Sequence, residues 1–103
     1  MKRLLVLFVA AMLLACADEP AKPLSEPGET LYPVRGTILS RRAADNTLNL
    51  DHEEIPGFMA AMKMDYAVRG AEVADLPQNG TRVEAKLHVT QRAYWITDVK
   101  AIP

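Results

Sequence analysis

The sequence predicts an all-β fold, a small barrel of five short strands that is closed or partly closed. From Val34 onward, apolar residues alternate with polar ones, as they do in strands that have one buried face. Turn-forming residues such as Asp45-Asn46 and Pro77 to Gly80 interrupt this alternation at short intervals. The chain shows no stretch with the periodicity of a long helix, so strands must supply most of the core.

The first two expected strands are Val34–Ser40 and Thr47–His52, joined by the first turn. Because successive side chains of a strand point to opposite faces, Leu48, Leu50 and His52 share one face. We expect this face to point into the barrel, with the histidine at the end of its strand.

The third expected strand follows a loop, Glu53 to Ala61, that contains Pro56-Gly57. In this strand Met62 and Met64 lie on one face, together with Tyr66 and Val68. His88 alternates outward with charged neighbours in a later strand, so we expect it on the surface. The elements expected after the loop are strands at Met62–Val68, Arg82–Thr90 and Tyr94–Ile102, with one helical turn at Val73–Leu76.

Five short strands in about 70 residues favour an OB-like five-stranded barrel. An open sheet of this size would expose one apolar face or leave long unpaired edges. The predicted barrel domain covers residues 34–103, and residues 16–33 are expected to be an extended tether, because they contain four prolines and little to bury.

The first fifteen residues predict a signal peptide. Lys2 and Arg3 precede an apolar run from Leu4 to Ala15, which is too short to cross a membrane. Without these residues, ten Lys and Arg face thirteen Asp and Glu, a formal charge of about −3. Negative charge and export both argue against nucleic-acid binding, which needs a surplus of cations.

The single cysteine, Cys16, directly follows the apolar run. Leu13-Leu14-Ala15-Cys16 resembles the bacterial lipobox, in which the cysteine carries the acyl chains of a lipoprotein. The alternative is an ordinary signal peptide that leaves a free thiol, which is a liability in an oxidising compartment. The anchored protein would face the periplasm, and Ala17 after the cysteine somewhat favours the outer membrane by the same resemblance.

All three methionines outside the signal peptide, Met59, Met62 and Met64, lie within six residues. Pairing of the second and third strands would place His52 beside the methionine pair, with Met59 in the covering loop. Thioethers and one imidazole form a soft, neutral ligand set that selects Cu(I), and by the same logic Ag(I), over Mg²⁺, Ca²⁺ or Zn²⁺. From the residues alone, a metal site and a methionine-filled core are equally good interpretations.

The segment from His52 to Met64 resembles the metal-binding segment of the CusF-like family of periplasmic copper- and silver-binding proteins. The flanks Val34–Ile38 and Tyr94–Thr97 resemble it as well, so the resemblance covers about residues 32–103. It implies a five-stranded OB-like barrel that binds Cu(I) and Ag(I) through one histidine and two methionines. These roles carry over to His52, Met62 and Met64.

One position departs from the family pattern. The family's founding member covers its metal with a tryptophan three residues before the first methionine, and here that residue is Met59 in a shorter loop. Met59 is therefore a candidate third ligand, or Phe58 shields the site instead. The only tryptophan, Trp95, lies in the last strand and has no assigned role.

These observations predict a non-enzymatic envelope protein that binds Cu(I), and by the same chemistry Ag(I). It would buffer the ion or pass it to a copper-exporting or copper-accepting envelope protein, as a metallochaperone in copper homeostasis or resistance. Because imidazole binds metal in its neutral form, affinity should fall as His52 becomes protonated. The alternative is a metal-free lipoprotein barrel that acts as a protein-interaction module.

Overall fold

The computed structural model describes residues 22–103. The predicted signal peptide at 1–15, the predicted acylation site Cys16 and the first part of the expected tether lie outside the described residues. Between residues 22 and 103, no helix has the length and apolar character needed to cross a membrane.

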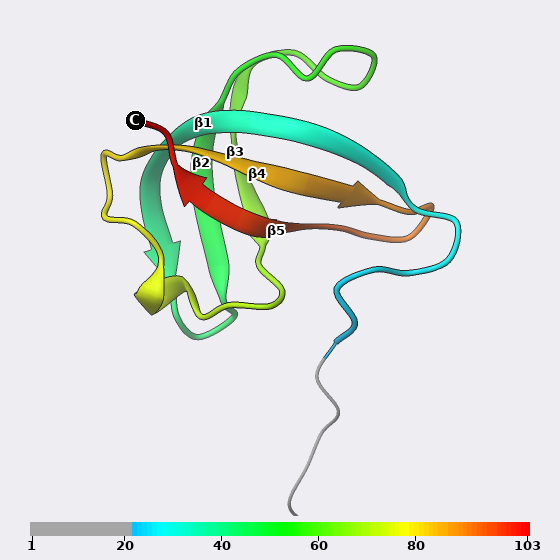
Figure 1. The fold of residues 1–103 in the computed structure, drawn as a ribbon, viewed down its shortest axis with the longest axis horizontal. Coiled ribbons are helices and arrows are strands. Elements are labelled where there is room, and N and C mark those ends of the chain that lie inside the picture. Colours follow the sequence, from blue (N-terminus) through cyan, green and yellow to red (C-terminus); the bar gives the residue numbers. More distant parts are fainter. Residues whose placement is uncertain (1–21) are drawn as a thin grey trace, which may run out of the picture.

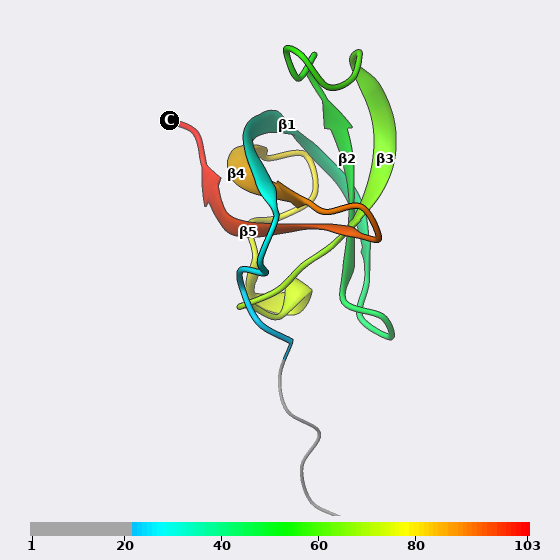
Figure 2. The ribbon, with the colours of Figure 1, turned by 90° about the vertical axis from the view of Figure 1, so that its right-hand side faces the viewer.

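The fold is all-β, as predicted, and its sheet curls into a barrel (Figures 1 and 2). The strands pair in the order β3-β2-β1-β4-β5, and every neighbouring pair is antiparallel. A single turn of 3-10 helix, η2, lies between β3 and β4 where one helical turn was expected. The elements are β1 (Thr30–Arg42), β2 (Thr47–His52), β3 (Met62–Ala67), η2 (Val73–Asp75), β4 (Arg82–Val89) and β5 (Tyr94–Ala101).

Strand β1 is long enough to belong to both halves of the barrel. Residues 30–37 pair with β4 and residues 36–42 pair with β2, so the two pairings overlap at Gly36 and Thr37. Pro33 fits in this strand because its segment pairs with β4 alone, which leaves one edge without a ladder. The barrel closes through a parallel bridge between Val68 and Ile96, supported by the backbone bond from Arg69 N to Ile96 O.

The barrel interior is apolar. The inward-facing side chains of β2 and β4, which the alternation predicted, fill much of it. Leu48 and Leu50 of β2 are buried, as are Val83 and Leu87 of β4. The other members of this core are Val34, Ile38, Ile55, Tyr66, Val68, Val73, Ala85 and Ile96.

The barrel end that holds the β1–β2 turn is tied together by Asn46. Its amide nitrogen donates to the carbonyls of Val68 and Ala71, and its amide oxygen accepts from the backbone N–H of Val73. Asn46 also has a φ of 53°, a left-handed conformation that asparagine tolerates better than most residues. One side chain therefore holds the β1–β2 turn against the loop after β3.

Two predictions need correction. Strand β1 begins at Thr30, four residues before the predicted start at Val34, and the last part of the expected tether packs against the barrel. His88 points outward from the barrel as predicted but is only 4% exposed, so its assignment to the surface was wrong. Residues from the expected tether and Trp95 of β5 cover it, which strand alternation alone does not reveal.

Candidate metal centre

His52 ends β2 at the barrel end opposite the Asn46 turn, and its side chain is only 1% exposed. Its Nδ1 lies 2.8 Å from the carbonyl oxygen of Glu53. A carbonyl only accepts hydrogen bonds, so in the neutral imidazole Nδ1 carries the proton and Nε2 carries the lone pair. Among the described residues, the buried Nε2 has no hydrogen-bond partner.

An orphaned buried nitrogen is costly unless something binds it. Metal-binding histidines commonly donate one ring N–H to a carbonyl and ligate through the other nitrogen. His52 has this arrangement, and the ligating atom would be Nε2.

Met62 begins β3 directly opposite His52 in the antiparallel ladder, as the sequence predicted. The Cβ atoms of such a pair lie about 4.5–5.5 Å apart, so a flexible thioether can reach the imidazole. Met62 lies at the rim of the barrel and is 48% exposed, rather than enclosed with the rest of its face.

Met64 lies two residues further along β3 and therefore on the same face as Met62. It pairs with Leu50 and packs, half-buried, against the apolar core. The structure thus brings His52, Met62 and Met64 to one end of the β2–β3 hairpin.

The third methionine, Met59, lies in the loop that joins β2 to β3. Ile55, Pro56, Gly57 and Phe58 form a turn closed by the bond from Phe58 N to Ile55 O, with Gly57 at a φ of 78°. Proline followed by a positive-φ glycine is typical of a type II turn. Met59 then bonds back to Ile55 in both directions and packs against the core, so the loop is short and ordered by its own hydrogen bonds.

The structure gives specific contacts to Phe58, the candidate shield, and to Trp95. The Phe58 ring stacks on Tyr32 of β1, with centroids 4.7 Å apart and planes 20° apart. Trp95 is fully buried, donates its indole N–H to the Leu24 carbonyl and stacks on His88. The structure therefore places Trp95 in a cluster with the N-terminal segment rather than beside His52.

Two residues that sequence reasoning did not single out shape the site. The ring of Tyr66 contacts His52 edge-on, with centroids 5.8 Å apart, and burial raises the pKa of Tyr66 to about 12. β2 lies between β3 and β1, and Gly36 of β1 pairs with His52. A glycine inside a strand is the sequence signal for such a close approach.

The surroundings of the site supply no alternative set of hard ligands. Glu53 pairs with Arg82, and Glu54 is exposed. Within residues 22–103, no three His, Cys, Asp or Glu side chains are grouped so that they could hold a metal ion. The soft candidate ligands that the structure brings near His52 are the thioethers of Met62 and Met64.

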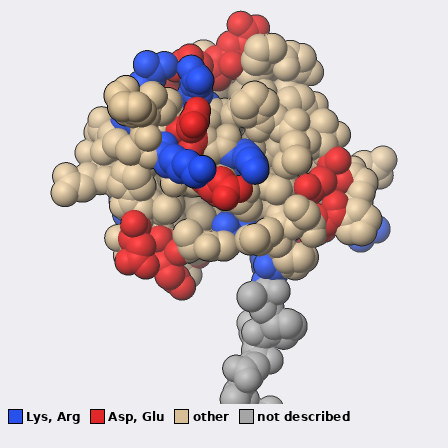
Figure 3. Space-filling view, viewed as in Figure 1, with Lys and Arg blue, Asp and Glu red and all other residues tan. Residues whose placement is uncertain are grey.

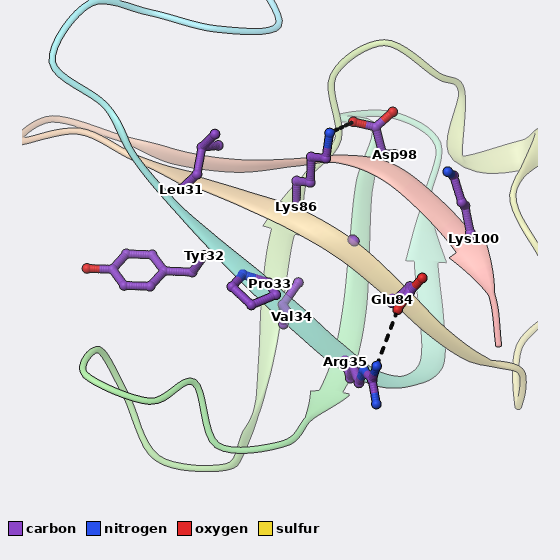
Figure 4. Close-up of a pocket in the computed structure, with 10 residues that line it drawn as sticks. Leu31, Tyr32, Pro33, Val34, Arg35, Glu84, Lys86, Asp98 and Lys100 are labelled. Atoms are coloured by element: carbon purple, nitrogen blue, oxygen red, sulfur yellow. Dashed lines mark ion pairs between the residues drawn. The ribbon is translucent and has the colours of Figure 1, made fainter.

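A groove of about 340 Å³ lies elsewhere, on the outer faces of β1, β4 and β5 (Figure 4). Ion pairs join Arg35 to Glu84 and Lys86 to Asp98 along it. On the face drawn in Figure 3, basic and acidic side chains of the described residues lie interspersed. Neither His52 nor any of the three methionines lines this groove. Its lining residues are Leu31, Tyr32, Pro33, Val34, Arg35, Glu84, Ala85, Lys86, Asp98 and Lys100.

Comparison with known proteins agrees with this architecture. A family model described as the copper-binding periplasmic protein CusF matches residues 31–101. The structure of apo-CusF from Escherichia coli superposes with a TM-score of 0.65 at 13% identity, covering 80% of this chain and 99% of that one. A comparison with curated protein sequences finds no match.

Two further structures are similar. A Cu(II)-bound variant of Escherichia coli CusF superposes with a TM-score of 0.59 at 13% identity, covering 79% of this chain and 100% of that one. The C-terminal domain of SilB from Cupriavidus metallidurans has a TM-score of 0.59 at 25% identity, covering 72% of this chain and 90% of that one. At 13% identity, the likeness to the CusF structures shows a shared fold.

Proposed function

Because this chain belongs to the family of the copper-binding periplasmic protein CusF, we propose that it binds Cu(I) through His52, Met62 and Met64. The family is a non-enzymatic one, so the ion is cargo and no reaction is catalysed. The observation that carries the proposal is the lone pair on His52 Nε2, which is buried without a partner among the described residues and lies on the strand position opposite Met62.

The donor set suits Cu(I), and by the same chemistry Ag(I). Two thioethers and one neutral imidazole bring no negative charge, and soft monovalent ions accept such ligands more readily than Zn²⁺ or Mg²⁺ do. His52 contacts the ring of Tyr66 and Met64 pairs with Leu50, so neither of these contacts brings a carboxylate, and the Glu53 carboxylate is paired with Arg82.

The different exposures of the ligands support exchange with a partner. His52 is enclosed, whereas Met62 stands at the rim and is half exposed. A ligand of an incoming protein can replace the Met62 sulfur first while the other two still hold the ion. We therefore expect the protein to buffer copper or pass it to a copper-exporting or copper-accepting envelope protein. Acyl chains on Cys16 would anchor it in the periplasm, with the outer membrane somewhat favoured.

The test is a titration of the full chain with Cu(I) under anaerobic, reducing conditions, with Ag(I), Cu(II) and Zn(II) in parallel. We expect one equivalent of Cu(I) or Ag(I) to bind more tightly than Zn(II). His52→Gln should abolish tight Cu(I) binding. His88→Gln is the matched control, because both ring nitrogens of that buried histidine already have partners in Glu29 and Thr97.

Two results would contradict the proposal. Equal loss of Cu(I) affinity in both histidine variants would indicate a general effect on the fold rather than loss of a ligand. A chain that binds no Cu(I) at all would instead favour the metal-free barrel that acts as a protein-interaction module.

A further inference from the structure

The segment that precedes β1 is fastened to the outside of the barrel. Trp95 donates its indole N–H to the Leu24 carbonyl at 2.9 Å. Arg69 pairs with Glu26 at 2.6 Å, and Nδ1 of His88 lies 3.0 Å from Glu29. We call residues 24–29 the clasp.

The residues that receive the clasp form one cluster on the barrel. The Arg69 guanidinium lies 3.7 Å from the centroid of the Trp95 ring, and the His88 ring is stacked on that same indole. The second nitrogen of His88 is hydrogen-bonded to Thr97 at 2.8 Å.

The clasp also holds its own shape and fits its place. The backbone N–H of Glu26 donates to the Glu29 carboxylate at 3.0 Å. A Cβ on Gly70 would lie 2.7 Å from the Leu24 side chain, so the glycine leaves room for it. Because the fastened groups are charged or aromatic and largely buried, opening the clasp would expose Trp95 and leave Arg69 and His88 without their carboxylates.

The clasp determines where the chain leaves the barrel. Lys22 lines a shallow groove with Asn46 and with residues 68–72. Asn46 directly precedes β2, and His52 ends that strand about 20 Å further on. Figures 1 and 2 both show the N-terminal segment leaving from the end of the barrel opposite the β2–β3 loop.

The clasp also shortens the reach of the barrel from its anchor. Cys16 and Lys22 are six residues apart, which allows at most about 20 Å. With the clasp open, the connection runs from Cys16 to Thr30, fourteen residues that allow about 50 Å. A closed clasp therefore keeps the Asn46 end, and not the Met62 end, close to the anchor.

We propose that the clasp orients the acylated protein on the membrane, so that the rim at Met62 faces away from the lipid surface. Copper would then be exchanged with protein domains that stand off the membrane rather than with sites in the membrane plane. This inference rests on the proposed acylation of Cys16 and on the proposed metal site.

The test uses the full acylated chain in lipid vesicles without copper, labelled with a fluorophore through Glu54→Cys in the β2–β3 loop. Energy transfer to acceptors on the lipid headgroups reports how near the rim lies to the membrane. We expect low transfer for this labelled chain. In the same labelled chain, Glu26→Gln with Glu29→Gln should raise transfer and make Trp95 accessible to a soluble quencher. The matched control is Asp75→Asn with Glu84→Gln, which removes the same charge at exposed positions outside the clasp and its groove and should change neither signal.

Three outcomes would overturn the proposal. They are high transfer in the labelled chain with its clasp residues intact, unchanged transfer after Trp95 becomes accessible, and a Trp95 that stays protected in the double variant. Two other measurements distinguish failure of the proposed function from failure of the proposed orientation. The mass of the chain shows whether Cys16 is acylated, without which no orientation exists, and the Cu(I) titration tests the metal site.

Discussion

Gly36 lies directly opposite His52 in the β1–β2 ladder, and there is no room for a side chain between them. A Cβ on Gly36 would lie 2.8 Å from the His52 Cα and 2.5 Å from the carbonyl oxygen of Asp51. The two strands can therefore approach this closely at the candidate copper ligand only because residue 36 has no side chain.

The first prediction concerns this close approach. Gly36→Ala should force β1 and β2 apart, cost about 1–3 kcal/mol of unfolding free energy and weaken Cu(I) binding. Urea denaturation and a Cu(I) competition titration measure the two effects. Arg35→Ala, at the adjacent exposed position, is the control and should change stability by no more than about 1 kcal/mol. Unchanged stability and Cu(I) affinity in Gly36→Ala would show that β1 and β2 can separate enough at this point to accept a methyl group.

The second prediction separates ligands from core filler. Met62→Leu and Met64→Leu nearly conserve volume, so each should cost less than about 1.5 kcal/mol of stability. Both should nevertheless weaken Cu(I) binding sharply, because leucine offers no sulfur. If the double variant keeps its Cu(I) affinity, the methionines only fill space. Met59→Leu measured alongside decides whether Met59 is a third ligand: loss of affinity assigns it to the ion, and no change assigns it to the loop.

The third prediction concerns Tyr66, whose buried hydroxyl has no hydrogen-bond partner among residues 22–103. Tyr66→Phe should be neutral or stabilising, because it removes an unsatisfied polar group and keeps the ring against His52. Tyr66→Ala should cost about 3–5 kcal/mol, because it leaves a cavity. Urea denaturation of both variants checks this, and a large loss in Tyr66→Phe would mean that the hydroxyl has a partner in solution.

Tyr66 should also make stability depend on alkaline pH. Burial raises its pKa from 10.0 to about 12, so the folded state favours the neutral phenol. This contribution is fully present below the unfolded pKa and is lost as pH rises through the interval up to about 12. The corresponding fall in unfolding free energy should be absent in Tyr66→Phe.

The fourth prediction concerns Glu29 at acid pH. The backbone N–H of Glu26 and the nearby His88 hold the pKa of Glu29 below its usual 4.5. Ionised Glu29 therefore stabilises the fold above that pH, and the contribution is lost as pH falls through the lower folded pKa. Unfolding free energy measured between neutral and acid pH should fall less steeply in Glu29→Gln than in the unaltered chain. Glu84→Gln, at an exposed position, should leave the slope unchanged, and equal slopes for all three chains would contradict the prediction.

The local sequence pattern was enough to predict how a strand pairs with the strand that follows it in the chain. Alternation in Thr47–His52 and in the strand from Met62, joined by a short loop, predicted that His52 and Met62 would be opposite each other, and the ladder confirms it. The same alternation placed His88 on the outer face correctly but could not show that this face is covered. A two-residue period reports which face of a strand a residue occupies, not what packs against that face.

The sequence by itself therefore determined the all-β barrel and the position of His52 opposite Met62, and it supplied the soft chemistry of the proposed ligands. These depend on residue type and on contacts between adjacent strands. Only the tertiary structure decided that Nε2 of His52 is the free nitrogen, that Gly36 makes room for the backbone of His52, and that Leu24 is bound to Trp95. The last two residues are separated by 71 positions, and a contact at that distance leaves no periodicity in either segment, because it depends on how the closed barrel brings the two segments together.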